Sequence, residues 1–265
     1  MDNLKLIAPA IIESIENWLE IKAATSTLAS NTRVAYHNDV TDFFIFLSEH
    51  HNEITQLSTV EKLKISDIRA WQAKLRNMNS GARSNARKLS SLKSYIRWLA
   101  KHRGFDATHI LSIKSPKFSN KLPRPLEPME AKAVLSECES TSTEPWVIAR
   151  DSAVLILLYG CGLRISEALD IRTKDIPLGN SMRVTGKGGK VRVVPVLKIA
   201  QNAVRHYVEL CPFQLSANDE IFRGVRGKPL SPKIIQNKMK LVRNLLGLPA
   251  SATPHALRHS FATHL

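Results

Sequence analysis

Cysteine is scarce in this 265-residue chain, and its three copies, Cys138, Cys161 and Cys211, lie far apart without a CxxC pair. An odd number with no paired spacing argues against a disulfide framework or a cysteine zinc site, so we expect a reducing compartment. Long hydrophobic runs are also missing, because no apolar stretch approaches the ~18 residues that a membrane helix needs. The amino terminus lacks the basic start and apolar core of a secretion signal, so the sequence predicts a soluble, cytoplasmic protein.

Acidic residues are nearly absent from one part of the chain. Residues 62–121 carry 15 basic and 2 acidic side chains, whereas residues 1–61 carry 3 basic and 9 acidic ones. The whole chain has a formal net charge of +15. Such a balance favours a polyanionic partner, nucleic acid or an anionic membrane surface, over a basic protein without a specific ligand.

Apolar periodicity predicts two domains. In residues 1–108, three- and four-residue spacing recurs, as in the stripe Ile11, Ile15, Trp18 and Leu19, and predicts a bundle of four helices. Residues 109–128 include a proline- and lysine-rich stretch and form a basic linker. Residues 129–265 predict further helices around one β-hairpin, "SMRVTGKGGKVRVVPV". The expected fold is mainly α with one small sheet.

Helix ends are marked by capping residues. We expect Ser66 to cap one helix of the first domain and Gly104 to end another. In the second domain, Ser231 and Thr253 precede Pro232 and Pro254, an arrangement typical of a capped helix start.

Basic side chains concentrate in and just before the last helix of the first domain. A solvated charged surface explains most such residues, but the near-absence of acids beside them makes the group a candidate DNA contact. The candidates are Arg83, Arg87, Lys88, Lys93 and Arg97.

The final stretch, "TPHALRHSFATHL", places His255, Arg258 and His259 on one helical face and Leu257, Phe261 and Leu265 on another. Three interpretations compete. A metal could bind the histidines, although the acid of an HExxH zinc motif is replaced by Ala256. The residues could equally form a surface pair beside a solvated arginine, or a phosphate clamp built on the guanidinium fork.

Two other stretches carry candidate residues. In "YGCGLRISEALDI", Arg164 either pairs internally with Glu167 or Asp170 or is held toward a ligand. The hairpin tip "TGKGGKVR" presents Lys187 and Lys190, and the phosphate-loop pattern GxxxxGK[ST] is absent there.

Taken in order, "GLRISEALDI", "GKGGKVRVVPV" and "PHALRHSFATHL" resemble the tyrosine recombinase (phage integrase) family over essentially the whole chain. The linker and bundle make it similar to the Xer subgroup, of the XerC type that resolves chromosome dimers. The resemblance implies a SAM-like core-binding domain that binds DNA and an α+β catalytic domain. It also implies catalytic roles for Arg164, Lys187, His255 and Arg258, and neither metal nor cofactor. Lys190, on the exposed hairpin turn, is a further candidate DNA contact.

The resemblance also implies partners and a reaction. Two duplexes would be cut and rejoined through 3′-phosphotyrosyl links, in a tetramer with a XerD-like recombinase and under a DNA translocase such as FtsK. Members of the family carry a second His or Trp and the nucleophilic tyrosine beyond the HxxR helix, and this chain has neither. Its four tyrosines, Tyr36, Tyr95, Tyr159 and Tyr207, all precede HxxR. We therefore expect an incomplete catalytic domain that is inactive in strand cleavage. The alternatives are an inert DNA-binding or regulatory protein of this fold, and a phage or integron integrase.

Overall fold

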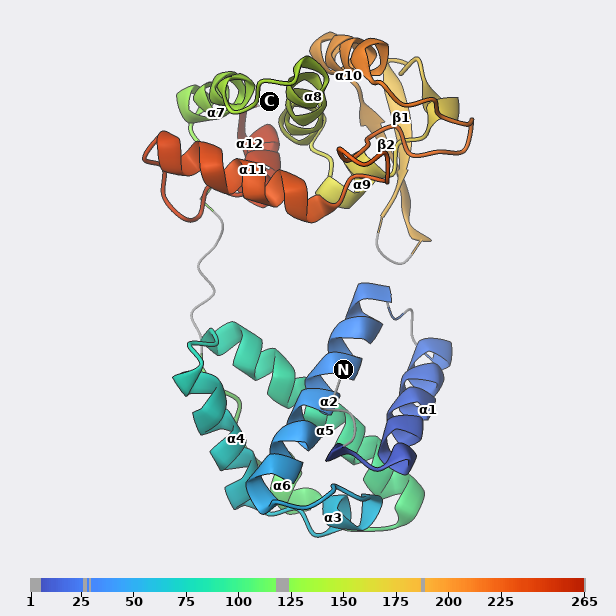
Figure 1. Cartoon of the computed structure of the whole chain (residues 1–265), viewed down its shortest axis with the longest axis vertical. Helices are drawn as coiled ribbons and strands as arrows, with labels where there is room; N and C mark the ends of the chain where they lie inside the picture. The colour runs from blue at the N-terminus through green and yellow to red at the C-terminus, as the bar shows by residue number, and fades with distance from the viewer. Residues whose placement is uncertain (1–5, 26–27, 29, 118–123, 187–188, 265) are drawn as a thin grey trace. The chain divides into compact units, whose positions relative to one another are not determined.

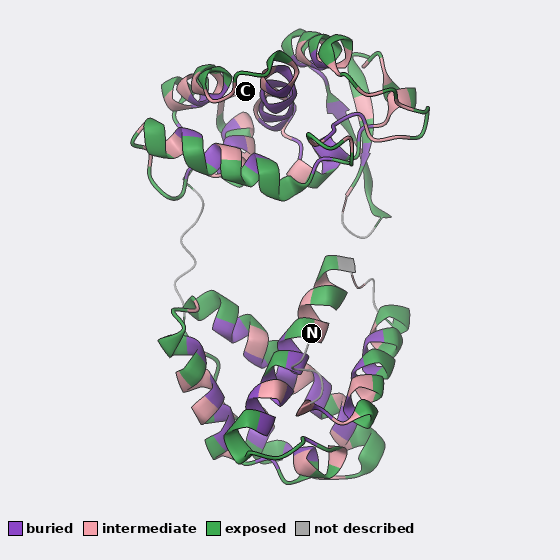
Figure 2. Cartoon of the chain, viewed as in Figure 1, coloured by how far each residue is buried: buried purple, intermediate pink, exposed green. Residues whose placement is uncertain are grey.

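The computed structural model describes residues 6–25, 28, 30–117, 124–186 and 189–264, and it divides into two compact units, residues 1–120 and 121–265 (Figure 1). The division lies inside the segment expected to be the linker. Each unit has its own cluster of buried apolar side chains (Figure 2). Among the described residues, no helix is both long and apolar enough to cross a membrane.

The first unit is entirely helical in its described secondary structure apart from an isolated bridge between Ile7 and Thr55. Its helices are α1 (Pro9–Thr25), α2 (Ser30–His51), α3 (Leu57–Glu61), α4 (Ile65–Asn77), α5 (Ala82–Arg103) and α6 (Thr108–Leu111). The four long helices match the expected bundle, and α3 and α6 are short additions. The predicted stripe of α1 is buried, and Phe43, Trp71 and Tyr95 fill the core that it covers.

The capping predictions in this unit had mixed outcomes. Gly104 ends α5 with a φ of 74°, as expected of a glycine stop. The prediction that Ser66 caps α4 was wrong, because the cap is Lys64, two residues earlier, and the helix begins at Ile65. The carboxylate of Asp67 accepts the Lys64 backbone N–H at 2.9 Å, and this bond fixes the first turn with Ser66 already inside it.

The second unit is built around one buried helix. Its elements are α7 (Pro128–Ser140), α8 (Pro145–Gly160), α9 (Ile165–Leu169), a 3₁₀ turn (Thr173–Asp175), β1 (Ser181–Thr185), β2 (Val191–Pro195), α10 (Lys198–Leu210), α11 (Pro232–Leu245) and α12 (Pro254–His264). Helix α8 is almost wholly buried and packs against α7, α10 and α12. Strands β1 and β2 pair antiparallel, as the hairpin prediction required. The mainly α fold with one small sheet is confirmed.

The start of α12 is held firmly in this unit. Ser231 Oγ accepts the Lys233 N–H at the start of α11, and Thr253 Oγ1 accepts the Ala256 N–H at the start of α12, so both predicted caps are confirmed. Buried Ser260 accepts the Leu126 N–H at 2.8 Å. These bonds anchor α12 on both sides of the residues whose side chains form the site.

Candidate phosphate-binding site

A tight turn between α8 and α9 brings Arg164 beside α12. Gly162 in this turn has a φ of 60°, and a Cβ atom built on it would lie 2.5 Å from Phe261 Cδ1 of α12. Only glycine allows both this backbone conformation and this approach. Phe261 is half-buried, less than the sequence pattern predicted, and the predicted Leu257 is fully buried. The turn therefore sets the spacing between Arg164 and α12.

Glu167 on α9 is the centre of the site, with a side chain only 5% exposed. Its Oε1 accepts Arg164 Nη1 at 2.7 Å and Arg192 Nη1 at 2.8 Å. Its Oε2 accepts the Arg164 backbone N–H at 2.7 Å, Arg192 Nη2 at 2.6 Å and Arg258 Nη1 at 3.3 Å. We call Glu167 and these three arginines the Glu167 cluster.

The cluster carries more positive than negative charge, because one carboxylate faces three guanidinium groups. Burial by itself would raise the pKa of Glu167, but hydrogen bonds from Arg192 and from Arg164 outweigh burial and lower the pKa to about 2. The carboxylate therefore stays ionised at neutral pH. Arg164 and Arg258 remain 51% and 21% exposed, so their other N–H groups are open to an anion.

His255 adjoins the cluster on α12 and contacts His259. The two Nε2 atoms lie 3.0 Å apart, so one ring donates to the other. Burial, followed by the neighbouring His259, Arg258 and Arg164, lowers the pKa of His255 and favours its neutral form. A neutral imidazole beside two arginines is able to exchange a proton with a bound group. Among the described residues, no cluster of three or more possible metal ligands is present.

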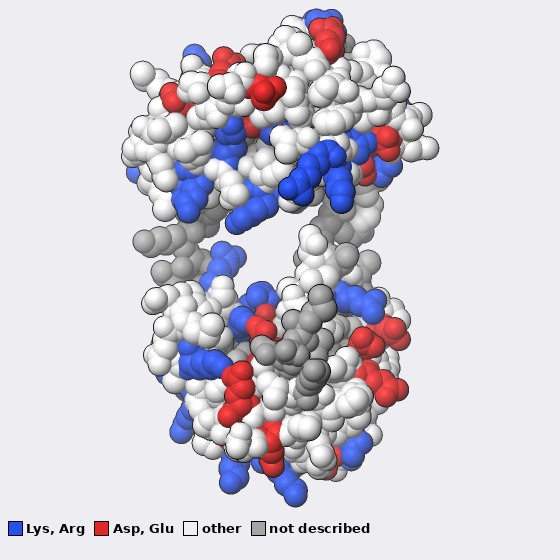
Figure 3. Space-filling view, in the orientation of Figure 1, with Lys and Arg blue, Asp and Glu red and all other residues white. Residues whose placement is uncertain are grey.

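A groove of about 360 Å³, with a mixed apolar and basic lining, leads away from His255 between α11 and the start of α12. Its lining includes Lys233, Gln236, Lys240 and Arg243. Figure 3 shows lysine and arginine side chains gathered along the side of this unit on which α11 lies. The groove extends the positive surface beyond the cluster and suits a long polyanion.

The structure thus brings together three of the four residues to which the sequence assigned catalytic roles. Arg164 and Arg258 share one carboxylate, and His255 lies next to them. The internal pair between Arg164 and Glu167 is also confirmed, and it coexists with exposure of the guanidinium. Lys187 lies outside the described residues, and Lys190 is exposed near the hairpin tip.

Sequence reasoning missed Arg192 and treated Glu167 only as one of two partners for Arg164. A signal for Arg192 was present in the hairpin. Because side chains alternate along a strand, Arg192 shares a face with Val194, which is buried, and it lies opposite buried Val184. A cation on the inward face of a small sheet needs a buried anion, and Glu167 is that anion.

The candidate DNA-binding residues of α5 fall into two groups. Arg87 pairs with Asp39, and Lys88 pairs with Asp42 at 2.6 Å. Lys93 donates to the carbonyl oxygens at the end of α6 and just beyond it, so it supports the fold. Arg83 and Arg97 are exposed and form no ion pair within the described part of the chain. Their contact with DNA stays a prediction.

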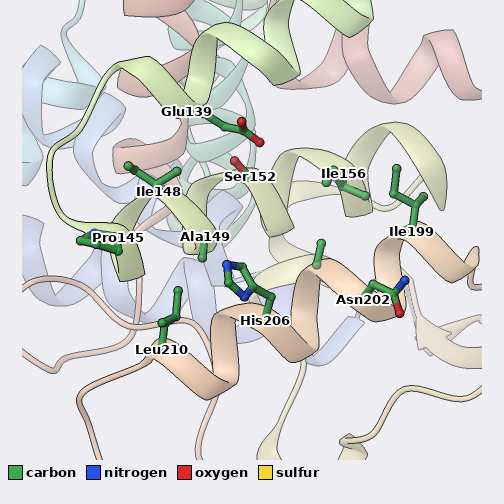
Figure 4. A pocket seen from close by; sticks show the side chains of 11 residues that line it. Glu139, Pro145, Ile148, Ala149, Ser152, Ile156, Ile199, Asn202, His206 and Leu210 are labelled. Atoms are coloured by element: carbon green, nitrogen blue, oxygen red, sulfur yellow. The ribbon is translucent and has the colours of Figure 1, made fainter.

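A second hollow of about 490 Å³ lies between α8 and α10, with Glu139 of α7 at its edge (Figure 4). Its lining is largely apolar, for example Ile148, Ile156 and Ile199, and includes no lysine or arginine. It shares no residue with the Glu167 cluster. An apolar hollow of this kind is not a phosphate site.

Comparison with known families identifies the class of protein that combines this bundle with this catalytic unit. Residues 124–265 match the phage integrase family, and residues 15–103 match the phage integrase N-terminal SAM-like domain. The first match covers more than half of the chain. The chain belongs to the phage integrase family, the tyrosine recombinases.

Individual relatives match this chain along nearly its whole length. The chain is 43% identical to the tyrosine recombinase XerC of Brucella suis biovar 1 (strain 1330), over 99% of this chain and 85% of the relative. It is 44% identical to the tyrosine recombinase XerC of Rhizobium meliloti (strain 1021), over 97% and 81%. This chain is therefore similar to XerC-type recombinases along nearly its whole length.

Solved structures share the fold at low sequence identity. A lambda integrase dimer bound to a COC' core site matches with a TM-score of 0.67 and 19% identity, over 94% of this chain and 68% of that one. XerH bound to palindromic difH substrate matches with a TM-score of 0.65 and 19% identity, over 86% and 68%. At these identities the likeness concerns the fold alone.

Proposed function

We propose that the protein acts in the cutting and rejoining of DNA at specific sites, a reaction of its family that proceeds through a 3′-phosphotyrosyl intermediate, and that Arg164 and Arg258 clamp the reacting phosphate. The observation that carries the proposal is the shared carboxylate of Glu167, which holds both guanidinium groups in fixed positions while leaving them exposed. Membership in the tyrosine recombinase family supports the reaction type.

The chemistry requires positive charge that is already in place. Attack on a phosphodiester passes through a five-coordinate state, in which negative charge builds on two non-bridging oxygens. Arginine forks held by a buried carboxylate stabilise that charge without reorganising at the moment of reaction. In this proposal His255 exchanges a proton near the attacking hydroxyl, and Lys187 protonates the departing 5′ oxygen.

Duplex DNA is the proposed partner, bound by both units. In the second unit, the groove beside α11 supports this proposal, because it carries three cations and two amide side chains next to His255. In the first unit, we propose contacts from Arg83 and Arg97, whose charges are not neutralised by described acids. Lambda integrase bound to a COC' core site and XerH bound to difH substrate share this fold, which also supports the proposal.

We propose further that residues 1–265 bind DNA without cleaving it, because none of the four tyrosines suits a nucleophile. Tyr95 and Tyr207 are fully buried, and the Tyr207 hydroxyl donates to the Ile221 carbonyl. Tyr36 stacks on Trp18 in the first unit. The Tyr159 hydroxyl lies 3.1 Å from His264 Nδ1, on a face of α12 that is turned away from Arg258.

A suicide substrate tests this proposal, since its nick traps a covalent protein–DNA adduct. Residues 1–265 should retard duplex DNA in a gel with strong salt dependence and yield no adduct. An adduct that disappears in Y159F would identify Tyr159 as the nucleophile and contradict the proposal. An adduct-free protein that also fails to bind DNA would contradict the recombinase function itself.

The biological setting is also a proposal. Similarity to XerC-type relatives supports a cytoplasmic role in resolving chromosome dimers, with a XerD-like recombinase in the tetramer and a DNA translocase such as FtsK as regulator. Mixing the protein with the XerD-like recombinase of its own organism on recombination-site DNA should give cooperative binding. Independent binding of the two proteins would contradict this partnership.

A further inference from the structure

Arg192 has a special position among the three arginines of the Glu167 cluster. It is the one that meets both carboxylate oxygens through its side chain, with Nη1 at 2.8 Å and Nη2 at 2.6 Å. Such a fork on a carboxylate is the strongest pairing open to arginine. Hydrogen bonding to Glu167 also raises the pKa of Arg192. The pair therefore ties strand β2 to helix α9.

More N–H groups approach the carboxylate of Glu167 than it has acceptor sites. An ionised carboxylate offers about four acceptor sites, and here five N–H groups approach it, two of them from Arg192. The longest of the five contacts, at 3.3 Å, belongs to Arg258. Arg258 is therefore held only by the edge of its guanidinium, and most of its donors stay unused.

We infer that Arg192 is a positioning residue that saturates Glu167 and thereby keeps Arg164 and Arg258 available to the phosphate. If Arg192 is removed, the buried carboxylate loses its fork and captures Arg258 or Arg164 in its place. The captured arginine then pairs with Glu167 and is no longer available to the phosphate. This inference rests on the proposed phosphate-binding function of the cluster.

The position of Arg192 separates this role from direct phosphate contact. Both of its Nη atoms are already committed to Glu167, whereas Arg164 and Arg258 each use one. The hairpin backbone also passes close to the guanidinium groups of Arg164 and Arg192. A Cβ atom built on Gly186 would lie 3.6 Å from the Nη1 atoms of both Arg164 and Arg192. The same pair thus docks the hairpin base onto the cluster.

A double-mutant cycle tests the inference. Inorganic phosphate is titrated into the full chain and followed by NMR on the Nε–H signals of Arg164 and Arg258. We expect R192Q to weaken phosphate binding by about tenfold. In this variant Glu167 can form two hydrogen bonds with Arg258 or Arg164, and the phosphate must then compete with Glu167 for that guanidinium. In the E167Q background the same R192Q change should cost less than about twofold, because no carboxylate remains to capture the clamp.

Two further variants control for charge and for folding. Arg183 on β1 is exposed and lies opposite Val193 in the same hairpin. R183Q removes the same charge and should leave phosphate binding within about twofold of wild type. R192K keeps the charge without the fork and should weaken binding by an intermediate factor, and it carries the test if R192Q does not fold.

Equal losses from R192Q in both backgrounds would overturn the inference, because Arg192 would then act by its charge or by touching phosphate itself. The phosphate-free protein gives an independent readout. Rotation of the Arg258 or Arg164 guanidinium should slow in R192Q as it takes over the fork on Glu167, and unchanged rotation would also overturn the inference. If rotation slows while wild type binds no phosphate at this site, the inference stands and the proposed function fails.

Discussion

Two buried carboxylates in the second unit, Asp151 and Glu167, show how one arrangement serves two purposes. Asp151 is fully buried and contacts Arg150 at 2.7 Å and Lys238 at 3.2 Å, whose side chains are 3% and 11% exposed. Glu167 is buried as well, but its arginines reach the surface. The cations around Asp151 are almost completely enclosed by the protein, whereas Arg164 and Arg258 beside Glu167 are partly exposed to solvent.

Burial of the acid therefore does not by itself define a functional site. A closed ion cluster joins helices, and its donors are used inside the protein, because Arg150 also donates to the Arg223 carbonyl and Lys238 to Thr141. An open cluster keeps surplus donors and surplus charge at the surface, where an anion completes it. Four sets of substitutions and one change of pH test this distinction, from the largest expected effect to the smallest.

The Asp151→Ala change should destabilise the protein by about 3–5 kcal/mol, because Arg150 and Lys238 are left buried without a counter-ion. The free energy of unfolding in urea measures this loss. E209Q, which removes an exposed acid from α10, is the control and should have little effect. A loss below about 1 kcal/mol for D151A would mean that the closed cluster is dispensable.

The Gly162→Ala change should destabilise the protein by about 1–3 kcal/mol, because it adds a strained φ and a clash with Phe261. Phosphate binding should also weaken as Arg164 moves away from Arg258. Gly104 also has a positive φ but no atom near its Cβ position, so G104A isolates the strain from the clash. Equal effects of G162A and G104A on thermal unfolding would contradict the role given to Phe261.

The Arg258→Gln change should weaken phosphate binding by about tenfold while altering stability by less than about 1 kcal/mol. Its Glu167 contact is the long one, so little folding energy is lost. Isothermal titration and thermal melts measure the two effects on one sample. A large stability loss with intact phosphate binding would make the Glu167 cluster structural, like the one around Asp151.

Acidification should break the ion pairs of the Glu167 cluster, because it protonates the Glu167 carboxylate. The pKa of Glu167 in the folded protein is about 2, below its usual 4.5, so the folded state binds fewer protons than the unfolded state in that range. The contribution of Glu167 to stability is therefore complete above about pH 4.5 and lost as the pH falls toward 2. Urea midpoints of wild type and E167Q should converge over this window, and parallel curves would contradict the ion pairing.

The paired and unpaired cations of α5 should differ in their effect on DNA binding. R83Q and R97Q should each reduce the slope of log affinity against log salt by about one. R87Q should reduce it less, because Arg87 already pairs with Asp39. Gel retardation of one duplex at several salt concentrations measures all three, and equal slopes would remove the distinction between the two groups.

Most of the fold followed from local patterns. The apolar stripe of α1, the Gly104 stop and the Ser231 and Thr253 caps are short-range features, and each was predicted from neighbouring residues. The cap of α4 was predicted wrongly because Ser66 is a favoured capping residue and Lys64 is not. The start at Ile65 is set from inside the first turn, where the Asp67 carboxylate accepts the Lys64 backbone N–H.

The residue types of the site and their helical faces are readable from the sequence, because spacing along one helix is a local property. His255, Arg258 and His259 share a face whatever surrounds them. In contrast, the meeting of Arg192 from β2 and Arg258 from α12 at one carboxylate follows from the folded structure. The contacts span 25 and 91 residues of chain, so they depend on how the turn at Gly162, the hairpin and α12 pack together. That packing, rather than any motif, makes a buried acid the centre of the open Glu167 cluster.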